Sequence, residues 1–402
     1  MRHLLDVPRP TALPNPAIGR GDPARRPYSP GRTSLRGRIA RHFNAGSVLV
    51  LLALLRLSVP ASGAPAWELG PFVRADAANP ILSPQNTTFD DPMQKKPVAW
   101  EQDNVFNPAA AVRDGEVCLL YRAEDHSGSG VGGHTSRVGL AESRDGLHFT
   151  RRPTPVLFPA EDGQKAYDWP GGCEDPRLVE TDAGGYVLTY TEWNRQTARL
   201  AVATSTDLAH WVKHGPVFAN ADGGRFLDHW SKSGSIVTRL AGDHLVATKI
   251  NGKYWMLWGE GMICAATSDD LINWDPVLDA NGDPRPLLTP RPGHFDSTLV
   301  EPGPPAVITD RGIVFLYNGK GDSGAYSAGQ ALLDPHDPTH VLARTDIYFL
   351  TPERPYERTG QYAAGTVFIE GLAHFHHRWW LYYGTADSHV AVAATPPQEV
   401  DR

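Results

Sequence analysis

Cysteine, clustered positive charge and long apolar runs are all scarce in this chain of 402 residues. The three cysteines, Cys118, Cys173 and Cys264, are too few for a disulfide framework, and their odd number leaves at least one thiol unpaired. Basic residues number 38 and acidic residues 45, which argues against a nucleic-acid-binding protein. No uninterrupted apolar run reaches the roughly 20 residues that a membrane-spanning helix requires.

The N-terminal part differs from the rest in composition. The first 64 residues contain 10 Arg, no Lys and only two acids. We expect residues 1–35 to be disordered, or to be an extension from a start codon assigned too early. Residues 36–64 combine an Arg-rich flank, a short apolar run and small residues at the exit, as a secretory signal does. A membrane anchor is the alternative, but Arg56 and Pro60 interrupt the run. The sequence thus predicts a secreted or periplasmic protein with no stable membrane anchor after signal removal.

Residues 65–402 are acidic and rich in turn-forming and aromatic residues. Without the first 64 residues the balance is 28 basic against 43 acidic residues, or −15, which disfavours an anionic polymer as substrate. The whole chain has 39 Gly, 35 Pro, 11 Trp and 13 Tyr, a composition that favours short strands and turns over long helices.

One three-segment pattern recurs along this region. A polar or acidic residue with Pro or Gly opens an apolar strand, a Tyr- or Trp-rich strand follows, and a small-residue strand comes last. The opening segments are 106–112, 174–179, 231–237, 301–307 and 369–375. Five repeats of short strands predict an all-β, five-bladed β-propeller that forms one catalytic domain over residues 65–402. A β-sandwich is the alternative, but the repeated register favours the propeller.

The openings of the repeats carry the polar residues that a propeller directs toward its centre. The openings supply Asn107, Glu174 with Asp175 and Arg177, Lys232, Glu301 and Glu370. The ends of the second strands and the turns after them supply Arg122, Asp125, Glu192, Glu260, Asn318 and Asp387. Paired carboxylates with aromatic walls suit sugars, because sugar rings stack on aromatic rings, sugar hydroxyls donate bidentate hydrogen bonds to carboxylates and two acids can perform acid/base catalysis.

Structural roles compete with these functional ones. Asp175 and Arg177 are equally well explained as a buried ion pair. Glu301 can equally be a turn residue, and Lys232 can be a solvated side chain. The three histidines in 374–377 look like a metal cluster, but two of them are neighbours in a predicted hairpin turn, where their side chains diverge. We therefore predict no metal site.

Four strings of residues resemble glycoside hydrolase family 130. They are Gly-Cys-Glu-Asp-Pro-Arg at 172–177, Tyr-Arg-Ala-Glu-Asp at 121–125, Glu-Pro-Gly-Pro-Pro at 301–305 and Tyr-Tyr-Gly-Thr-Ala-Asp-Ser at 382–388. The resemblance extends over residues 78–396. It implies a five-bladed propeller that acts on β-mannosides without a metal or organic cofactor, either as an inverting phosphorylase or as a hydrolase that favours β-1,2 linkages.

The same resemblance implies roles for individual residues. Asp175 falls on the family's proton donor, which in the phosphorylases acts through a sugar hydroxyl. Arg122, Asp125, Arg177 and Asp387 match positions that shape the sugar and acceptor site.

Two departures bear on the reaction. The phosphorylases tend to have Tyr-His-Gly where this chain has Tyr317-Asn-Gly319, and His-Arg-Pro where it has Trp258-Gly-Glu260. Asn318 and Glu260 thus replace groups that hold phosphate, and an acid at 260 can activate water instead, with Glu301 as the rival base.

The resulting prediction is a secreted inverting glycosidase that hydrolyses β-mannosidic, chiefly β-1,2, linkages in oligosaccharides. A β-mannoside phosphorylase that releases mannose 1-phosphate is the alternative, since Lys232, Arg122 and Arg177 keep positive charge near the site. A non-catalytic mannoside-binding propeller is the second alternative.

Overall fold

The computed structural model describes residues 67–397, which all belong to one contact unit, Pro60–Arg402. The predicted extension at 1–35 and secretory signal at 36–64 lie outside the described residues. Within residues 67–397, the helical structure consists of α1 (Lys165–Asp168), α2 (Pro355–Arg358) and the single 3-10 turn η1 (Ala221–Gly224). None of these described helices has the length and apolar character needed to cross a bilayer. The all-β prediction is confirmed.

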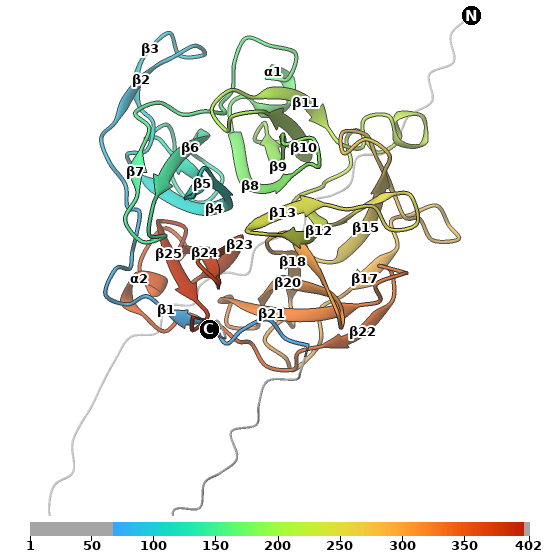
Figure 1. The fold of residues 1–402 in the computed structure, drawn as a ribbon. Helices are drawn as coiled ribbons and strands as arrows, with labels where there is room; N and C mark the ends of the chain where they lie inside the picture. Colours follow the sequence, from blue (N-terminus) through green and yellow to red (C-terminus); the bar gives the residue numbers. More distant parts are fainter. Residues whose placement is uncertain (1–66, 398–402) are drawn as a thin grey trace, which may run out of the picture. The chain divides into compact units, whose positions relative to one another are not determined.

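The strands follow one another as antiparallel meanders that surround a common centre (Figure 1). The first meander consists of β4 (Asn104–Arg113), β5 (Glu116–Glu124), β6 (Ser136–Ser143) and β7 (Thr150–Arg151). The second consists of β8 (Gly172–Glu180), β9 (Tyr186–Trp193), β10 (Ala198–Ser205) and β11 (Val212–Pro216). Each predicted three-segment repeat in this half therefore forms three successive strands of one sheet.

The next two meanders are interrupted in their inner strands. The third consists of β12 (Ser235–Ala241), β13 (His244–Ala247), β14 (Tyr254–Trp258), β15 (Ile263–Ser268), β16 (Trp274–Pro276) and β17 (Pro286–Leu288). The fourth consists of β18 (Leu299–Pro302), β19 (Ala306–Thr309), β20 (Gly312–Lys320), β21 (Tyr326–Leu333) and β22 (Val341–Arg344). Parallel pairing of β12 with β19 joins the two groups.

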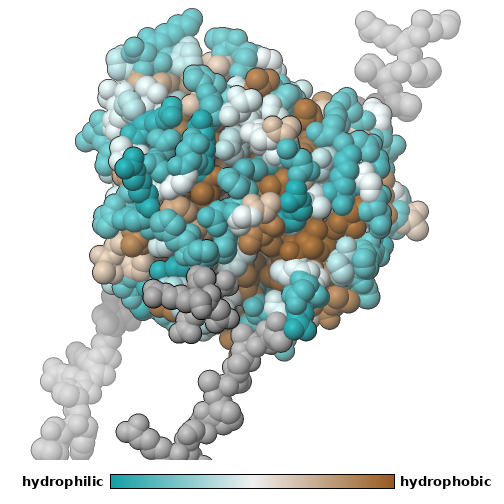
Figure 2. All heavy atoms as spheres, viewed as in Figure 1, coloured by the Kyte–Doolittle hydropathy of each residue, from teal (hydrophilic) through white to brown (hydrophobic). Residues whose placement is uncertain are grey.

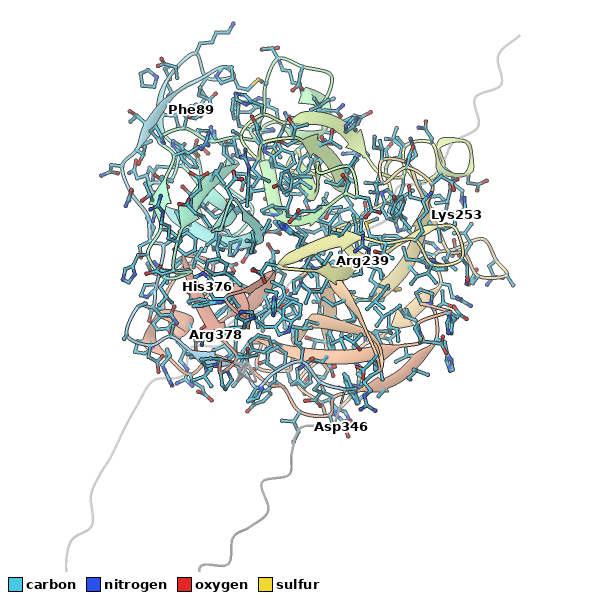
Figure 3. The ribbon with its side chains drawn as sticks, in the orientation of Figure 1. Phe89, Arg239, Lys253, Asp346, His376 and Arg378 are labelled. Atoms are coloured by element: carbon cyan, nitrogen blue, oxygen red, sulfur yellow. The ribbon has the colours of Figure 1, made fainter. Side chains whose placement is uncertain are left out.

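The last sheet combines both ends of the described chain. It has the order β1–β25–β24–β23, with β23 (Val367–Phe375), β24 (Arg378–Thr385), β25 (His389–Ala394) and the early strand β1 (Val73–Arg74). A separate hairpin is formed by β2 (Thr88–Asp91) and β3 (Lys96–Ala99). The turn between β23 and β24 holds His376 and His377, both at positive φ, so the predicted hairpin turn is confirmed; His376 and Arg378 are labelled in Figure 3.

Apolar residues of neighbouring sheets pack against one another. One core cluster joins Val117 and Tyr121 of β5 to Trp380 and Tyr382 of β24. The third strands contain small residues, and Gly139 of β6 and Gly329 of β21 lie against the rings of Tyr121 and Tyr317 on the preceding strands. Hydrophilic residues cover most of the face shown in Figure 2, and apolar residues are visible toward its middle. Cys118, Cys173 and Cys264 are all buried free thiols.

The outer turns repeat a Ser-x-Asp motif. In the third meander the Ser268 hydroxyl accepts the Leu271 N–H at 2.9 Å, and Asp270 accepts the Ile272 and Asn273 N–H groups at 2.9 and 2.8 Å. Equivalent hydrogen bonds follow Ser143 and Ser205. Short side chains that accept backbone N–H groups stabilise such turns locally.

The inner strands are irregular where the repeats open. The pairing register shifts between Phe106 and Pro108 in β4, between Glu174 and Arg177 in β8 and between Ile369 and Gly371 in β23. A bulge turns an extra side chain out of the ladder. The residues turned out are Asn107 and Asp175, both at positive φ, and Glu370. Because β4, β8 and β23 contact one another, these side chains are directed to one region.

Candidate active site

Asp175 is a buried carboxylate that three polar side chains of other repeats contact. Its Oδ1 accepts hydrogen bonds from Asn107 Nδ2 at 2.9 Å and from the Arg122 guanidinium at 3.0 Å. Lys232 Nζ lies 3.4 Å from its Oδ2. Four predicted site residues from three sheets therefore meet at one carboxylate. The predicted ion-pair role of Asp175 with Arg177 is not seen, because Arg177 contacts only the backbone oxygen of Asp175, at 3.0 Å.

The charges around Asp175 decide its protonation. Burial raises the pKa of Asp175, but Arg122, Lys232 and the hydrogen bond from Asn107 outweigh burial and hold that pKa well below its usual range. The carboxyl is consequently ionised in the free protein at any pH near neutrality. A general acid needs a proton, so Asp175 alone does not suit the predicted role in this state.

The pKa values of two neighbouring carboxyls, Glu174 and Asp387, are raised rather than lowered. Burial, opposed by Arg122 and Lys232, raises the pKa of Glu174 to about 7. Burial, opposed by Arg122 and reinforced by Asp175, raises the pKa of Asp387 to about 7. Glu174 contacts the same Arg122 guanidinium at 2.8 Å and lies 3.9 Å from Lys232 Nζ. The pair Glu174–Asp175 therefore shares its cations and can hold one proton near neutral pH.

The predicted bases, Glu260 and Glu301, lie close enough to Lys232 to influence its pKa. Glu301 is buried and accepts a hydrogen bond from the Ser233 hydroxyl. Burial and the nearby charge of Glu260, opposed by Lys232 and Arg177, raise the pKa of Glu301 to about 7. The carboxylate of Glu260 accepts the Trp230 indole N–H at 2.8 Å. Glu301 is therefore not a simple turn residue, and a carboxyl with such a pKa can accept a proton from water.

Lys232 links the two sides of the site. Burial would lower its pKa, but Asp175, Glu260, Glu174 and Glu301 together raise it well above the usual range. The ammonium is therefore permanently charged. Its position excludes the solvated alternative and makes it the cation common to both groups of acids.

Glu370 and Arg177 form a buried pair in this region. The two side chains are buried, and their charged groups lie 3.1 Å apart. Neither oxygen of Glu370 has a hydrogen-bond partner. Burial, with smaller contributions from Asp175 and Glu301 and despite Arg177, raises the pKa of Glu370 well above its usual range. This burial favours a neutral carboxyl group beside Arg177, with both oxygens free of hydrogen bonds.

Three residues predicted to bind substrate are instead occupied by the protein. Asn318 joins β20 to β23, donating to Ile369 O at 3.1 Å and accepting the Ile369 N–H at 2.8 Å. Arg177 donates to the carbonyls of Gly303 and Pro302 at 3.0 and 2.8 Å. Asp125 accepts from Arg137 at 2.9 Å and from loop N–H groups. These side chains fix the walls of the site and leave few polar atoms for a sugar.

Sequence reasoning missed several contributors. Glu124, within the string Tyr-Arg-Ala-Glu-Asp, accepts from Arg122 at 2.7 Å and from Gln361 at 3.0 Å. Ser233 and Trp230 flank Lys232 in sequence and contact Glu301 and Glu260, respectively. Proximity to Lys232 was the signal available for the last two. Within residues 67–397, no group of three or more His, Cys, Asp or Glu side chains has the geometry of a metal site.

This arrangement suits displacement at a sugar carbon. The carboxyl pair Glu174–Asp175, which Arg122 and Lys232 contact, can hold a proton. The second group of acids is Glu260 and Glu301, of which Glu301 titrates near neutral pH. Proton donation on one side and activation of a nucleophile on the other are the two functions that an inverting glycosidase divides between carboxyls.

Comparison with known proteins identifies relatives along almost the whole described region. A glycoside hydrolase family model, described as beta-1,4-mannooligosaccharide phosphorylase, matches residues 72–401. The chain is 34% identical to a 1,2-beta-oligomannan phosphorylase from Thermoanaerobacter sp. (strain X514) over 313 residues, which cover 77% of this chain and 95% of the relative.

Two solved structures resemble this one more strongly. A glycosyl hydrolase from Bacteroides ovatus is 50% identical, with a TM-score of 0.81, and the match covers 84% of this chain and 98% of the other. A second structure, with 50% identity, a TM-score of 0.82 and coverage of 84% and 97%, is described as showing that the family of mannoside phosphorylases contains glycoside hydrolases that target beta-1,2 mannosidic linkages in Candida mannan.

Proposed function

Because the chain belongs to glycoside hydrolase family 130, an enzyme family that acts on β-mannosidic linkages, we propose that it cleaves β-1,2-linked mannooligosaccharides with inversion and uses water as the attacking group. The observation that carries this proposal is that Glu260 and Glu301 are hydrogen-bonded by Trp230 and Ser233, which flank Lys232 in the sequence. A carboxylate pair repels a phosphate anion, whereas Glu301, with a pKa raised to about 7, can deprotonate water.

Proton delivery to the leaving sugar is assigned to the Glu174–Asp175 pair. Asp175 is directed into the site by the β8 bulge, and Glu174 supplies the carboxyl that is protonated near neutral pH. Arg122 and Lys232 bind both carboxyls and hold them in place. Asn107 and Asp387 complete this side and are proposed to bind sugar hydroxyls.

The architecture that supports this site is proposed to be the five-bladed propeller expected from the repeats. Each antiparallel meander is then one blade, and the inner-strand bulges of β4, β8 and β23 direct their side chains toward the axis. Lys232 precedes β12 and Glu301 lies in the regularly paired strand β18, so the openings of the third and fourth meanders contribute these two residues without such a bulge.

A phosphorylase is the second candidate, and the curated relatives support it better than they support the hydrolase. The relatives that match this chain over most of their own length are named phosphorylases. The structural observation in its favour is the buried Arg122 guanidinium together with the partly exposed Lys232 ammonium, since both cations can attract an anion. Under this alternative phosphate replaces water as the nucleophile and mannose 1-phosphate is released.

Product analysis separates the two candidates. The purified chain is incubated with β-1,2-mannobiose in phosphate-free buffer and again with millimolar phosphate. The hydrolase gives free mannose in both, with no rate gain from phosphate, and its first product is the α anomer by proton NMR. Strict dependence on phosphate with mannose 1-phosphate as product establishes the phosphorylase. Failure to release any product leaves the mannoside-binding alternative.

Export is proposed separately, from residues 36–64 alone. An exported enzyme gains nothing from conserving bond energy as a sugar phosphate, which supports hydrolysis. Native protein that begins near residue 65 fits this proposal, whereas N-terminal sequencing that finds Met1 contradicts it.

A further inference from the structure

A pocket of about 370 Å³ lies beside Glu260. Its lining includes His229, Trp230, Trp258 and Met262 as well as Glu260 itself. Asp175, Arg122 and Lys232 do not contribute to it. The pocket therefore adjoins the proposed nucleophile side of the site and is distinct from the cluster around the proton-donating pair.

Trp230 presents an oriented aromatic face at this pocket. Its side chain is 47% exposed, and Met262 nearby is 45% exposed, which is unusual for such large apolar groups. The indole N–H is bound to Glu260, and Trp193 packs edge-on against the ring with centroids 5.8 Å apart. The ring is thus held in one orientation before any ligand arrives, and a fixed aromatic face is what the apolar side of a sugar ring stacks upon.

Trp258 supplies an unused donor at the same place. It is almost completely buried, with 2% exposure, and its indole N–H has no hydrogen-bond partner. A buried donor without an acceptor is costly, so each such group calls for an explanation. His229 packs against Trp258 at 5.9 Å, and burial lowers the pKa of His229, which leaves that ring neutral.

Charge defines the chemical class of the ligand. The ionisable residues that line the pocket are the two acids Glu260 and Asp283 and the neutral His229, so an anion is disfavoured. Aromatic walls with a free N–H donor and carboxylate acceptors match an uncharged molecule that has both hydroxyl groups and an apolar face. A hexopyranose ring has that combination.

We propose that this pocket is an accessory subsite that takes a mannosyl unit beyond the two that flank the cleaved bond, with Trp230 as its stacking platform. The proposal rests on the proposed function in one respect, namely that the substrate is a mannooligosaccharide. It adds that the enzyme prefers chains of three or more units, because only these can reach both the carboxyl cluster and the pocket.

The test compares β-1,2-mannobiose with β-1,2-mannotriose. Values of kcat/KM are measured for the full chain and for Trp230→Ala, Trp230→Phe and Met262→Ala, counting mannose and mannose 1-phosphate together so that the nucleophile is immaterial.

Trp230→Ala is expected to lower kcat/KM for the trisaccharide roughly 10-fold more than for the disaccharide. Trp230→Phe keeps an aromatic face but loses the N–H, so it lowers both values alike. Met262→Ala lowers the ratio of trisaccharide to disaccharide. Tyr348→Ala, at an aromatic residue exposed elsewhere (42%), leaves both values unchanged.

A Trp230→Ala variant that slows both substrates by the same factor overturns the subsite, since the residue then only positions Glu260. An unmodified enzyme that cleaves neither substrate defeats the proposed function instead. In that event calorimetry decides the subsite: mannotriose binding at least about 10-fold more tightly than mannobiose, with the difference lost in Met262→Ala, supports it, and equal binding rejects it.

Discussion

Acidic residues serve two different purposes in the centre and at the outer turns of this protein. At the outer turns, Asp270 and its counterparts after Ser143 and Ser205 accept backbone N–H groups only a few residues away. In the centre, Asp175 and Glu301 contact side chains from other sheets. Local contacts leave the outer acids ionised and structural, whereas burial beside like and unlike charges moves the pKa values of the inner acids in both directions.

The two classes of acid differ in how much of the fold must form before each acid has its role. An outer acid needs only its own turn, so its role is present as soon as the hairpin forms. An inner acid acquires its chemistry only after several sheets have assembled around it. The following changes separate the two classes, beginning with the largest expected effect.

Asp175→Asn is expected to lower turnover by roughly 10²–10⁴-fold, the usual contribution of a general acid. The side chain keeps its shape, and Asn tolerates the positive φ of this position, so the fold should persist. Steady-state cleavage of β-1,2-mannobiose measures the effect, with Asp270→Asn as the matched acid-to-amide control. Activity within threefold of the unmodified protein would remove Asp175 from proton delivery, and failure to fold would make it structural.

Glu301→Gln is expected to slow cleavage roughly 10²–10³-fold, because the amide cannot accept a proton from water. Glu260→Gln should have the smaller effect, since Glu260 acts on Glu301 by repulsion. Initial rates in phosphate-free buffer distinguish the two, and Glu142→Gln at the outer edge of β6 serves as the control. A larger loss in Glu260→Gln moves the base to that residue and keeps the hydrolase.

Stability should depend on pH through Glu301. Its pKa rises from 4.5 in the reference state to about 7 in the fold, so the folded protein holds a proton that the unfolded chain releases between these values. The associated stability is complete below pH about 4.5 and is lost as the pH rises through about 7. Urea unfolding at pH 5 and pH 8 should therefore show a decline that is smaller by about 1–3 kcal/mol in Glu301→Gln. An identical decline in both proteins would contradict this account.

Asp270→Ala tests the outer class and should have the smallest effect. The change removes two hydrogen bonds to backbone N–H groups in an exposed turn, comparable to the loss of a helix cap, and should cost about 1 kcal/mol of unfolding free energy. Chemical denaturation measures the cost, and cleavage of β-1,2-mannobiose should be unchanged. A loss of activity comparable to that of Asp175→Asn would show that the two regions are not independent.

The sequence was sufficient for features that depend on local pattern. The strands of the repeats and the hairpin turn at His376 and His377 follow from the recurring pattern of polar, aromatic and small residues and from the turn residues. The openings of the repeats also marked the positions of Asn107, Asp175 and Glu370, because a Pro or Gly beside a polar residue indicates a break in the ladder. The number of blades was predicted on the same grounds and stays a prediction.

Roles that depend on distant partners were less accessible. Asn318 and Arg177 were expected to face the sugar, but their hydrogen bonds go to the carbonyls or N–H groups of Ile369, Pro302 and Gly303. Nothing in the residues near Asn318 reveals that β23 passes beside it. The ionised state of Asp175 was missed for the same reason, since Arg122 and Lys232, which cause it, come from other repeats.

Pairing of β1 with β25 has a consequence for the order in which this protein can be completed during synthesis. Val73 and Arg74 leave the ribosome before every other strand of their sheet, yet their partners Ala394 and Ala393 leave it last. Arg74 also reaches Glu357 at 2.7 Å, another late residue. Until the final strand emerges, the early strand has no edge to join, and the last sheet remains unfinished. A chain whose synthesis stops before β25 therefore leaves both β1 and β24 without the strand that joins them.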